Sequence, residues 1–403
     1  MAPNTVPVRP PRDLRLDVIR GWMQISIFIS HVAGTRFAWG IHANWGLSDS
    51  SEQFVLLSGL TLGSVFTLKM ARNGFGMAST DMLQRTFRLH RTHLLVFCAF
   101  AAFVLVAEAT HLLPGEVARL HWALLAERPW LALPAAAAML YQPDFMGILP
   151  VFVCGMALLP GFLWLARRIG AWALLPSVLL YGAVQAGWLA MPAPFENGIA
   201  FDPLAWQLLF LFGAWIGHRT LLRGPVVPRS VLLSGGALCV VLVGLWMRLV
   251  EHGFLAGPAL AAEALMHKEV LAPPRLLHAL SLAYLVAVVV PREAGWMHLL
   301  PGRVLTCIGR NSLRVFCAGL FLAWGAGAML RLHPEAAPLI DLLVIALGMA
   351  VLAAVAWLAE PGHGRGHRAQ RPGAMPMMPR GQWKRWAGGR DTACPNPIPG
   401  SGP

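Results

Sequence analysis

Charged residues are scarce in this 403-residue chain, where they make up 13% of the sequence against 57% for hydrophobic residues. A soluble domain carries about 25% charged residues. The deficit excludes intrinsic disorder for most of the chain and argues against an ordinary soluble enzyme. Tyrosine is scarce as well, with 3 residues against 16 tryptophans, and tryptophan favours the membrane–water interface. These proportions predict a membrane protein.

Several motifs are also missing. The six cysteines form no Cys-x-x-Cys pair, so neither a disulfide framework nor a cysteine metal site is predicted. The Gly-x-Ser-x-Gly elbow of serine hydrolases is absent, and we find no internal repeat of the kind common in secondary transporters. His90 and His93 have a spacing suited to a metal, but Arg88 and Arg91 beside them would repel a cation. No metal site is predicted.

The net charge of +13 does not indicate a nucleic-acid partner. The basic residues recur between apolar runs instead of forming one continuous basic face. Lys and Arg between membrane spans mark the cytoplasmic side. The charge pattern therefore indicates membrane topology.

Ten apolar runs approach the roughly 20 residues that a helix needs to cross a bilayer. If the N-terminus is cytoplasmic, most Lys and Arg residues fall on the inner side, which places the C-terminus there too. We therefore expect an all-α, polytopic membrane protein of about ten transmembrane helices. The expected spans are 15–34, 52–70, 92–112, 144–165, 171–190, 203–217, 230–249, 276–291, 311–331 and 337–358.

Three further segments complete the expected organisation. The first apolar run has no convincing cleavage site, so we expect it to be retained as a helix. The apolar stretch 120–140 is broken by Glu127, Arg128 and Pro129, which indicates a re-entrant or interfacial segment. We assign residues 1–360 to the transmembrane domain. Residues 361–403 are rich in Gly, Pro and Arg and are predicted to be a disordered cytoplasmic tail, suited to anionic lipid.

The first span carries ionisable residues, which are costly in a membrane and suggest function. Arg20 and His31 are eleven residues apart, so they share one helix face about 16 Å apart along the axis. Asp17 lies one turn before Arg20 and can pair with it. In the alternative interpretation Asp17 caps the helix, Arg20 extends to the headgroups and His31 sits at the outer interface.

Arg, ten residues, then His on the first span resembles the signature of the acyltransferase family 3 membrane proteins. Further ordered blocks make the chain most similar to one branch, the OpgC proteins. Two departures are Ser30, where the family has an Asp, and Leu60-Thr61, where an aromatic residue is expected. The blocks are RDLRLD at 12–17, RG at 20–21, HVAG at 31–34, NWGLSD at 44–49, EQFVLLSG at 52–59, YQPDFMGILP at 141–150, FDPLAWQ at 201–207 and GRNSL at 309–313.

The resemblance implies an acyltransferase of the bacterial inner (cytoplasmic) membrane. It would carry an acyl group, in this branch succinyl, from cytoplasmic acyl-CoA to a hydroxyl of a periplasmic glucan or related glycan. Acyl-CoA would be a co-substrate, and no tightly bound cofactor is expected. His31 would be the general base, because a neutral imidazole can take a hydroxyl proton near pH 7.

Other residues receive roles on the same basis. Arg20 suits phosphate or carboxylate binding. Arg85 and Arg88 are expected to hold the CoA phosphates, or only to set topology. Arg310 and Asn311 are expected to bind CoA phosphate, or to cap their helix.

Residues near the expected outer side complete the candidate site. Glu52 could orient His31 or cap its own helix. Tyr141, Asp144, Trp206 and Gln207 are expected to hold the sugar, although Trp206 also suits the interfacial aromatic belt. Ser58 is a candidate for substrate binding, or it permits close helix packing with Gly59. His278 could line the cavity or lie at the interface.

Two other classes of function remain open. A transporter or flippase for a glycan or lipid-linked sugar would use Arg20 and His31 to line a path, without acyl chemistry. A sensor or scaffold would tolerate replacement of both residues. Dependence on acyl-CoA, with release of free CoA, separates the enzyme from these alternatives.

Overall fold

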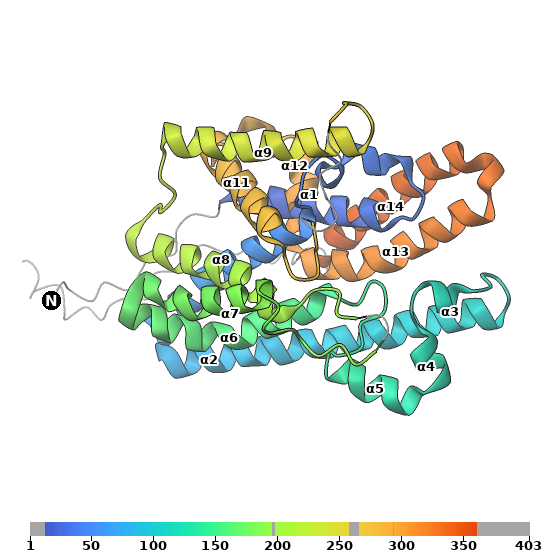
Figure 1. Ribbon diagram of the computed structural model, residues 1–403, viewed down its shortest axis with the longest axis horizontal. Coiled ribbons are helices and arrows are strands. Elements are labelled where there is room, and N and C mark those ends of the chain that lie inside the picture. Colours follow the sequence, from blue (N-terminus) through green and yellow to red (C-terminus); the bar gives the residue numbers. More distant parts are fainter. Residues whose placement is uncertain (1–12, 196–197, 258–265, 293, 361–403) are drawn as a thin grey trace, which may run out of the picture. The chain divides into compact units, whose positions relative to one another are not determined.

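The computed structural model describes residues 13–195, 198–257, 266–292 and 294–360 (Figure 1). Over these ranges the structure is helical and contains no strand, which confirms the all-α prediction. The tail predicted at 361–403 lies outside the described residues.

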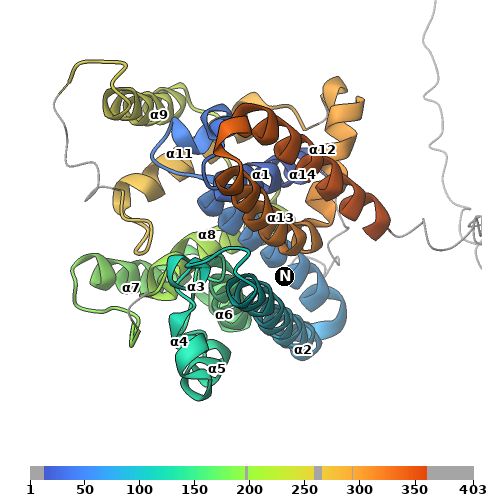
Figure 2. The same cartoon turned by 90° about the vertical axis from the view of Figure 1, so that its right-hand side faces the viewer.

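The helices associate in two groups, which Figure 2 shows on opposite sides of the picture. In one group, α1 (Leu14–His31) packs against α12 (Leu300–Arg310) and α13 (Ser312–Leu332), and α14 (Ala337–Ala359) packs against α12 and α13. In the other, α2 (Ser50–Ala109), α6 (Ile148–Ile169), α7 (Leu175–Gln185) and α8 (Pro203–Arg223) pack together. Helix α1 also contacts α2, which joins the groups.

The remaining elements are connectors and one peripheral pair. Helix α9 (Val231–Glu251) packs against α11 (Pro273–Val289). The stretch 120–140 was expected to be a re-entrant or interfacial segment. In the structure it contains two short helices, and the second begins at Pro129. The short elements are α3 (Glu116–Arg119), α4 (Ala123–Glu127), α5 (Pro129–Ala137), and the 3-10 turns η1 (Arg36–Gly40), η2 (His42–Asn44), η3 (Gly170–Leu174), η4 (Gly295–His298) and η5 (Pro334–Ala336).

Helix α2 is not straight. Gly74 has φ 83° and ψ 165°, a left-handed conformation that favours glycine. Lys69 Nζ lies 2.6 Å from an Asp81 carboxylate oxygen. Twelve residues of straight helix would separate these positions by about 18 Å, so the chain turns sharply at Gly74. The expected spans 52–70 and 92–112 are therefore two arms of one bent helix.

Five helical stretches are long and apolar enough to cross a membrane: Ser50–Ala109, Ile148–Gln185, Val231–Glu251, Ser312–Leu332 and Pro338–Ala359. Together they contain most of the expected spans. The expected spans 15–34, 203–217 and 276–291 are helical, as α1, α8 and α11, but are not among these five. The number ten and the cytoplasmic position of both termini stay predictions.

Glycines bring α2 and α8 into backbone contact. A Cβ added at Gly59 would lie 2.0 Å from the carbonyl oxygen of Phe210, and one at Gly213 would lie 2.2 Å from that of Leu56. Gly63 and Gly217, four residues further on, make equally close approaches. This is the small-xxx-small spacing that lets membrane helices approach closely.

Replacing Gly213 by alanine is expected to lower the free energy of unfolding by about 1–3 kcal/mol, because the added methyl group would force the two backbones apart. Gly182 in α7 has no atom within 4 Å of an added Cβ, and alanine there should cost nothing. Thermal unfolding of both variants in detergent checks the prediction. Equal melting temperatures for the two variants would contradict it.

Candidate functional site

His31 is the last residue of α1, and its ring is held by the backbone of its own helix. Nδ1 lies 2.7 Å from the carbonyl oxygen of Ile27. A carbonyl oxygen only accepts, so Nδ1 carries the proton and donates it, and Nε2 keeps its lone pair. The neighbouring Ser30 donates its hydroxyl to the same carbonyl at 2.9 Å. The Ile27 carbonyl thus orients the imidazole with Nε2 as the basic atom.

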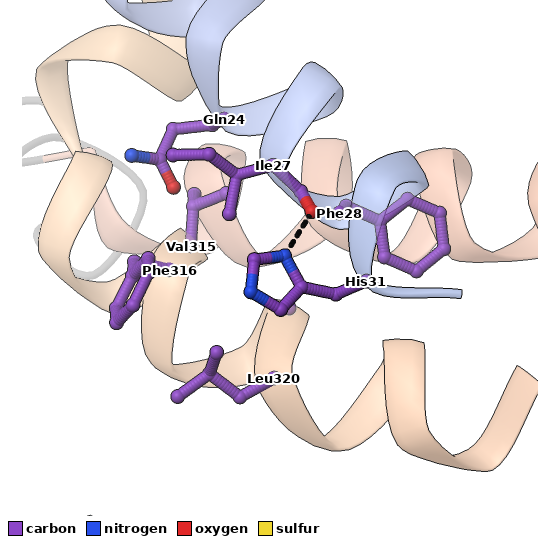
Figure 3. A pocket seen from close by; sticks show the side chains of 8 residues that line it. Gln24, Ile27, Phe28, His31, Val315, Phe316 and Leu320 are labelled. Carbon is purple, nitrogen blue, oxygen red and sulfur yellow. Dashed lines mark hydrogen bonds between the residues drawn. The ribbon is translucent and has the colours of Figure 1, made fainter. Parts of the chain in front are cut away.

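The imidazole opens on a small pocket between α1 and α13 (Figure 3). Gln24 and His31 are the polar side chains of its lining, and the rest of the lining is apolar. Gln24 is 2% exposed, and its Nε2 has no hydrogen-bond partner among the described residues. The lining residues are Gln24, Ile27, Phe28, His31, Val315, Phe316, Gly319 and Leu320.

Arg20 does not line this pocket. Its Nη2 donates to the carbonyl oxygen of Leu57 at 2.9 Å and to the hydroxyl of Thr61, both on α2. Asp17 is 4% exposed and lies 3.7 Å from Nε of Arg310 on α12. These two residues of the first span therefore connect α1 to its neighbours.

The other residues expected to hold CoA phosphates are spread over the chain. Arg310 reaches Asp17 and, at 3.9 Å, Glu360. Asn311 donates to the carbonyl oxygen of Ala356 at 3.2 Å and so ties the start of α13 to α14. Arg85 pairs with Asp81 at 2.8 Å beyond the bend of α2, and Arg88 is exposed. Of the four, Arg310 is the residue with a contact to the first span.

Two of the residues expected to hold a sugar, Trp206 and Gln207, form hydrogen bonds within the protein. Trp206 is fully buried and donates Nε1–H to the carbonyl oxygen of Lys268 at 3.0 Å. Gln207 donates to the Ser177 carbonyl oxygen at 3.0 Å and accepts the hydroxyl of the same serine. Both side chains bind other parts of the chain in this structure.

Tyr141 and Asp144 differ from each other in exposure. The Tyr141 hydroxyl is buried against the carbonyl oxygen of His121, at 2.8 Å. Asp144 is about half exposed and lies 3.0 Å from Nδ1 of the same histidine. Ser58 is half-buried on α2 beside Gly59, which touches α8.

Glu52 belongs to a buried ionic cluster at the start of α2. One of its oxygens accepts from Nε of Arg275 at 2.8 Å, and the other accepts from the backbone N–H of Asp49 at 2.9 Å. Asp49 is also 3.2 Å from Arg275 and 2.7 Å from Nζ of Lys268. Glu52 is fully buried and the Arg275 side chain is 6% exposed. Glu52 thus caps its own helix, the second of its two expected roles, and neutralises Arg275.

The charges of the cluster also set the ionisation of its own acid, Asp49. Burial alone would raise the pKa of Asp49, but Lys268 and Arg275 outweigh it and hold that pKa well below its usual value. The ionised carboxylate of Asp49 therefore stabilises the folded state.

A depressed pKa has a defined consequence for acid stability. Asp49 contributes stability that is complete above the pKa of an unfolded aspartate, about 3.9, and is lost as the pH falls toward its lower folded value. We expect Asp49→Asn to melt below the wild type at pH 7, with the gap narrowing below about pH 4. Melting temperatures in detergent from pH 7 to pH 3 measure this. A gap that is constant over the whole range would contradict it.

Comparison with known proteins decides the family. A family model described as OpgC protein matches residues 12–363. This chain belongs to the OpgC family. Searches of the curated proteins and of the solved structures find no match.

Within this OpgC family chain, Gln24 is the site residue that sequence analysis missed. It stands seven residues before His31, two turns away on the same helix face. A polar residue at that spacing within an apolar run was the available signal.

His278 was expected to line a cavity or to lie at an interface. It is 3% exposed, with Nδ1 2.7 Å from the Ser48 hydroxyl. Its ring fits between Gly46 and Gly244, where added Cβ atoms would lie 2.6 and 2.7 Å from it. In this structure it is a packed core residue of the OpgC family chain.

Proposed function

We propose that this membrane protein of the OpgC family is an O-acyltransferase. It transfers an acyl group, with succinyl as the first candidate, from acyl-CoA to a hydroxyl of a periplasmic glucan or related glycan in the bacterial inner membrane. The family match and the apolar helices support this assignment.

The observation that carries the proposal is the orientation of His31. Its Nδ1 proton is committed to the Ile27 carbonyl, so Nε2 is available as a base at the edge of a pocket. A base must lie within hydrogen-bond reach of the proton that it removes, so the proposal puts the acceptor hydroxyl beside Nε2 at this pocket.

The chemistry follows from that base. The oxygen of the acceptor hydroxyl attacks the carbonyl carbon of the thioester, and Nε2 of His31 takes the proton of that hydroxyl. The carbon–sulfur bond then breaks, and the leaving CoA thiolate takes the proton from the imidazolium. The products are an ester on the glycan and free CoA thiol.

The CoA itself is assigned to the side of Arg20 and Arg310. Arginine donors suit its phosphates, and Arg20 lies about 16 Å along α1 from His31. The pocket lining from Gln24 to His31 then receives the acyl end. Arg85, Arg88 and Asn311 remain candidates for further phosphate contacts, and Asp144, which is partly exposed, for the sugar.

The deciding experiment is release of free thiol from succinyl-CoA by the protein in lipid vesicles, with and without a glycan extract. Acetyl-CoA in a parallel reaction tests the acyl group. Acceptor-dependent thiol release, with the added acyl mass recovered on the glycan, is the expected result. Glycan movement across the vesicle membrane without thiol release would instead support a transporter or flippase. Neither thiol release nor movement would contradict both functions.

A further inference from the structure

The buried amide of Gln24 lowers the stability of the fold unless it has a partner. Its amide is buried in a largely apolar pocket, and its Nε2 has no partner among the described residues. Leaving a buried donor unpaired costs about 1–3 kcal/mol, and such groups in native proteins call for an explanation. A leucine would fill similar space without that cost.

The position of Gln24 relative to His31 suggests what the donor is for. Seven residues of helix separate the two by about 10 Å along the axis. Figure 3 shows both side chains at the same pocket, with Phe316 and Leu320 across from them. The terminal amide torsion of glutamine is broad, so its N–H can turn into the pocket.

Both side chains line one pocket, so they can act on the two partners of one reaction. The Gln24 amide can donate to a carbonyl oxygen at about 2.7–3.1 Å, and Nε2 of His31 can accept from the attacking hydroxyl at about 2.6–3.2 Å.

We propose that Gln24 is a catalytic residue: its amide N–H binds the carbonyl oxygen of the acyl thioester and stabilises the negative charge that forms there when the hydroxyl held by His31 attacks. This rests on the proposed acyltransferase function. The oxygen gains its charge as the carbonyl π electrons move onto it, and it returns them when the CoA thiolate leaves. Gln24 gains and loses no proton.

Gln24→Leu tests the proposal, with Gln53→Leu as the matched control. Gln53 is also a buried glutamine, but its Nε2 donates to the Ala279 carbonyl oxygen at 3.0 Å. Removing one donor from an oxyanion site lowers kcat by about 100- to 1,000-fold. We expect Gln24→Leu to show that loss, with KM for acyl-CoA raised by no more than about 3- to 10-fold, the value of one net hydrogen bond, and with a melting temperature equal to or above that of the wild type. Gln53→Leu should melt lower and retain kcat.

A binding measurement keeps the proposal testable without turnover. A CoA ketone analogue retains the carbonyl but cannot transfer its acyl group, and the matching alkyl thioether lacks the carbonyl. The wild type should bind the ketone about 3- to 10-fold more tightly than the thioether, the value of one net hydrogen bond, and Gln24→Leu should bind both equally.

The outcomes separate the two proposals. If the wild type transfers acyl groups and Gln24→Leu matches it in kcat and in ketone preference, the role of Gln24 is wrong and the acyltransferase stands. If the wild type releases no thiol and shows no ketone preference, both are wrong. A lower melting temperature for Gln24→Leu, with kcat falling only in proportion to folded protein, would make Gln24 a structural residue.

Discussion

His31→Gln is expected to lower kcat about 100- to 10,000-fold, the usual contribution of a general base. Glutamine keeps a polar side chain at the end of α1 but has no basic nitrogen that can take a hydroxyl proton near neutral pH. Because the base acts in the transition state, KM for acyl-CoA should change little. Thiol release under saturating acyl-CoA, at equal amounts of folded protein in vesicles, measures the effect.

Two control variants belong with this experiment. His333 lies at the end of α13 with a side chain 47% exposed, and His333→Gln should retain wild-type kcat. Ser30→Ala should cost far less than His31→Gln, because the Ile27 carbonyl still orients the imidazole after the hydroxyl is gone. Wild-type turnover by His31→Gln would remove His31 as the base. A loss by His333→Gln of the same size would show that the assay reports something other than the pocket.

Arg275→Met is expected to lower the free energy of unfolding by about 3–5 kcal/mol, because breaking a buried ion pair leaves an uncompensated charge. Glu52 is fully buried, and Arg275 donates to it at 2.8 Å and to Asp49 at 3.2 Å. Methionine fills similar space without charge, so the loss comes mainly from the buried Glu52 carboxyl, since Asp49 keeps its ion pair with Lys268. Thermal or chemical unfolding in detergent gives the value.

The control for this prediction is an arginine whose ion pair is exposed. The Arg85 side chain is 39% exposed, and its partner Asp81 also binds Lys69, so Arg85→Met should cost at most about 1 kcal/mol. The double variant Arg275→Met with Glu52→Gln should regain part of the loss, because the buried carboxylate is then neutral. An Arg275→Met variant as stable as Arg85→Met would show that the cluster contributes little to the fold.

The sequence predicted features that depend on neighbouring residues. Apolar runs of the right length indicated the helices. The eleven-residue spacing predicted one shared face for Arg20 and His31, but Arg20 bonds to α2 while His31 lines the pocket beside α13. The same periodicity would have identified Gln24 if polar residues without a charge had been considered.

Features that depend on distant residues were not predictable in this way. Glu52 meets Arg275, 223 positions later, and Trp206 meets the Lys268 carbonyl, 62 positions later. The sharp bend at Gly74 depends on one φ angle that a glycine permits but does not require. Helix α12 lies between the expected spans 276–291 and 311–331 and was not predicted. Its close contact with α1, between Gly309 and the Asp17 carbonyl, joins residues far apart in the sequence.

The two walls of the pocket differ in how they are held. The first half of helix α1 is held by backbone contacts with α12, of Gly21 with Leu305 and of Asp17 with Gly309, and by Arg20 bound to α2. On α13 the pocket meets the side chains of Phe316 and Leu320, which can change rotamer without moving a backbone. If the proposed acyl transfer takes place in this pocket, we expect substitutions of Phe316 and Leu320 to alter the length of acyl group accepted, because these two side chains face Gln24 and His31 across it.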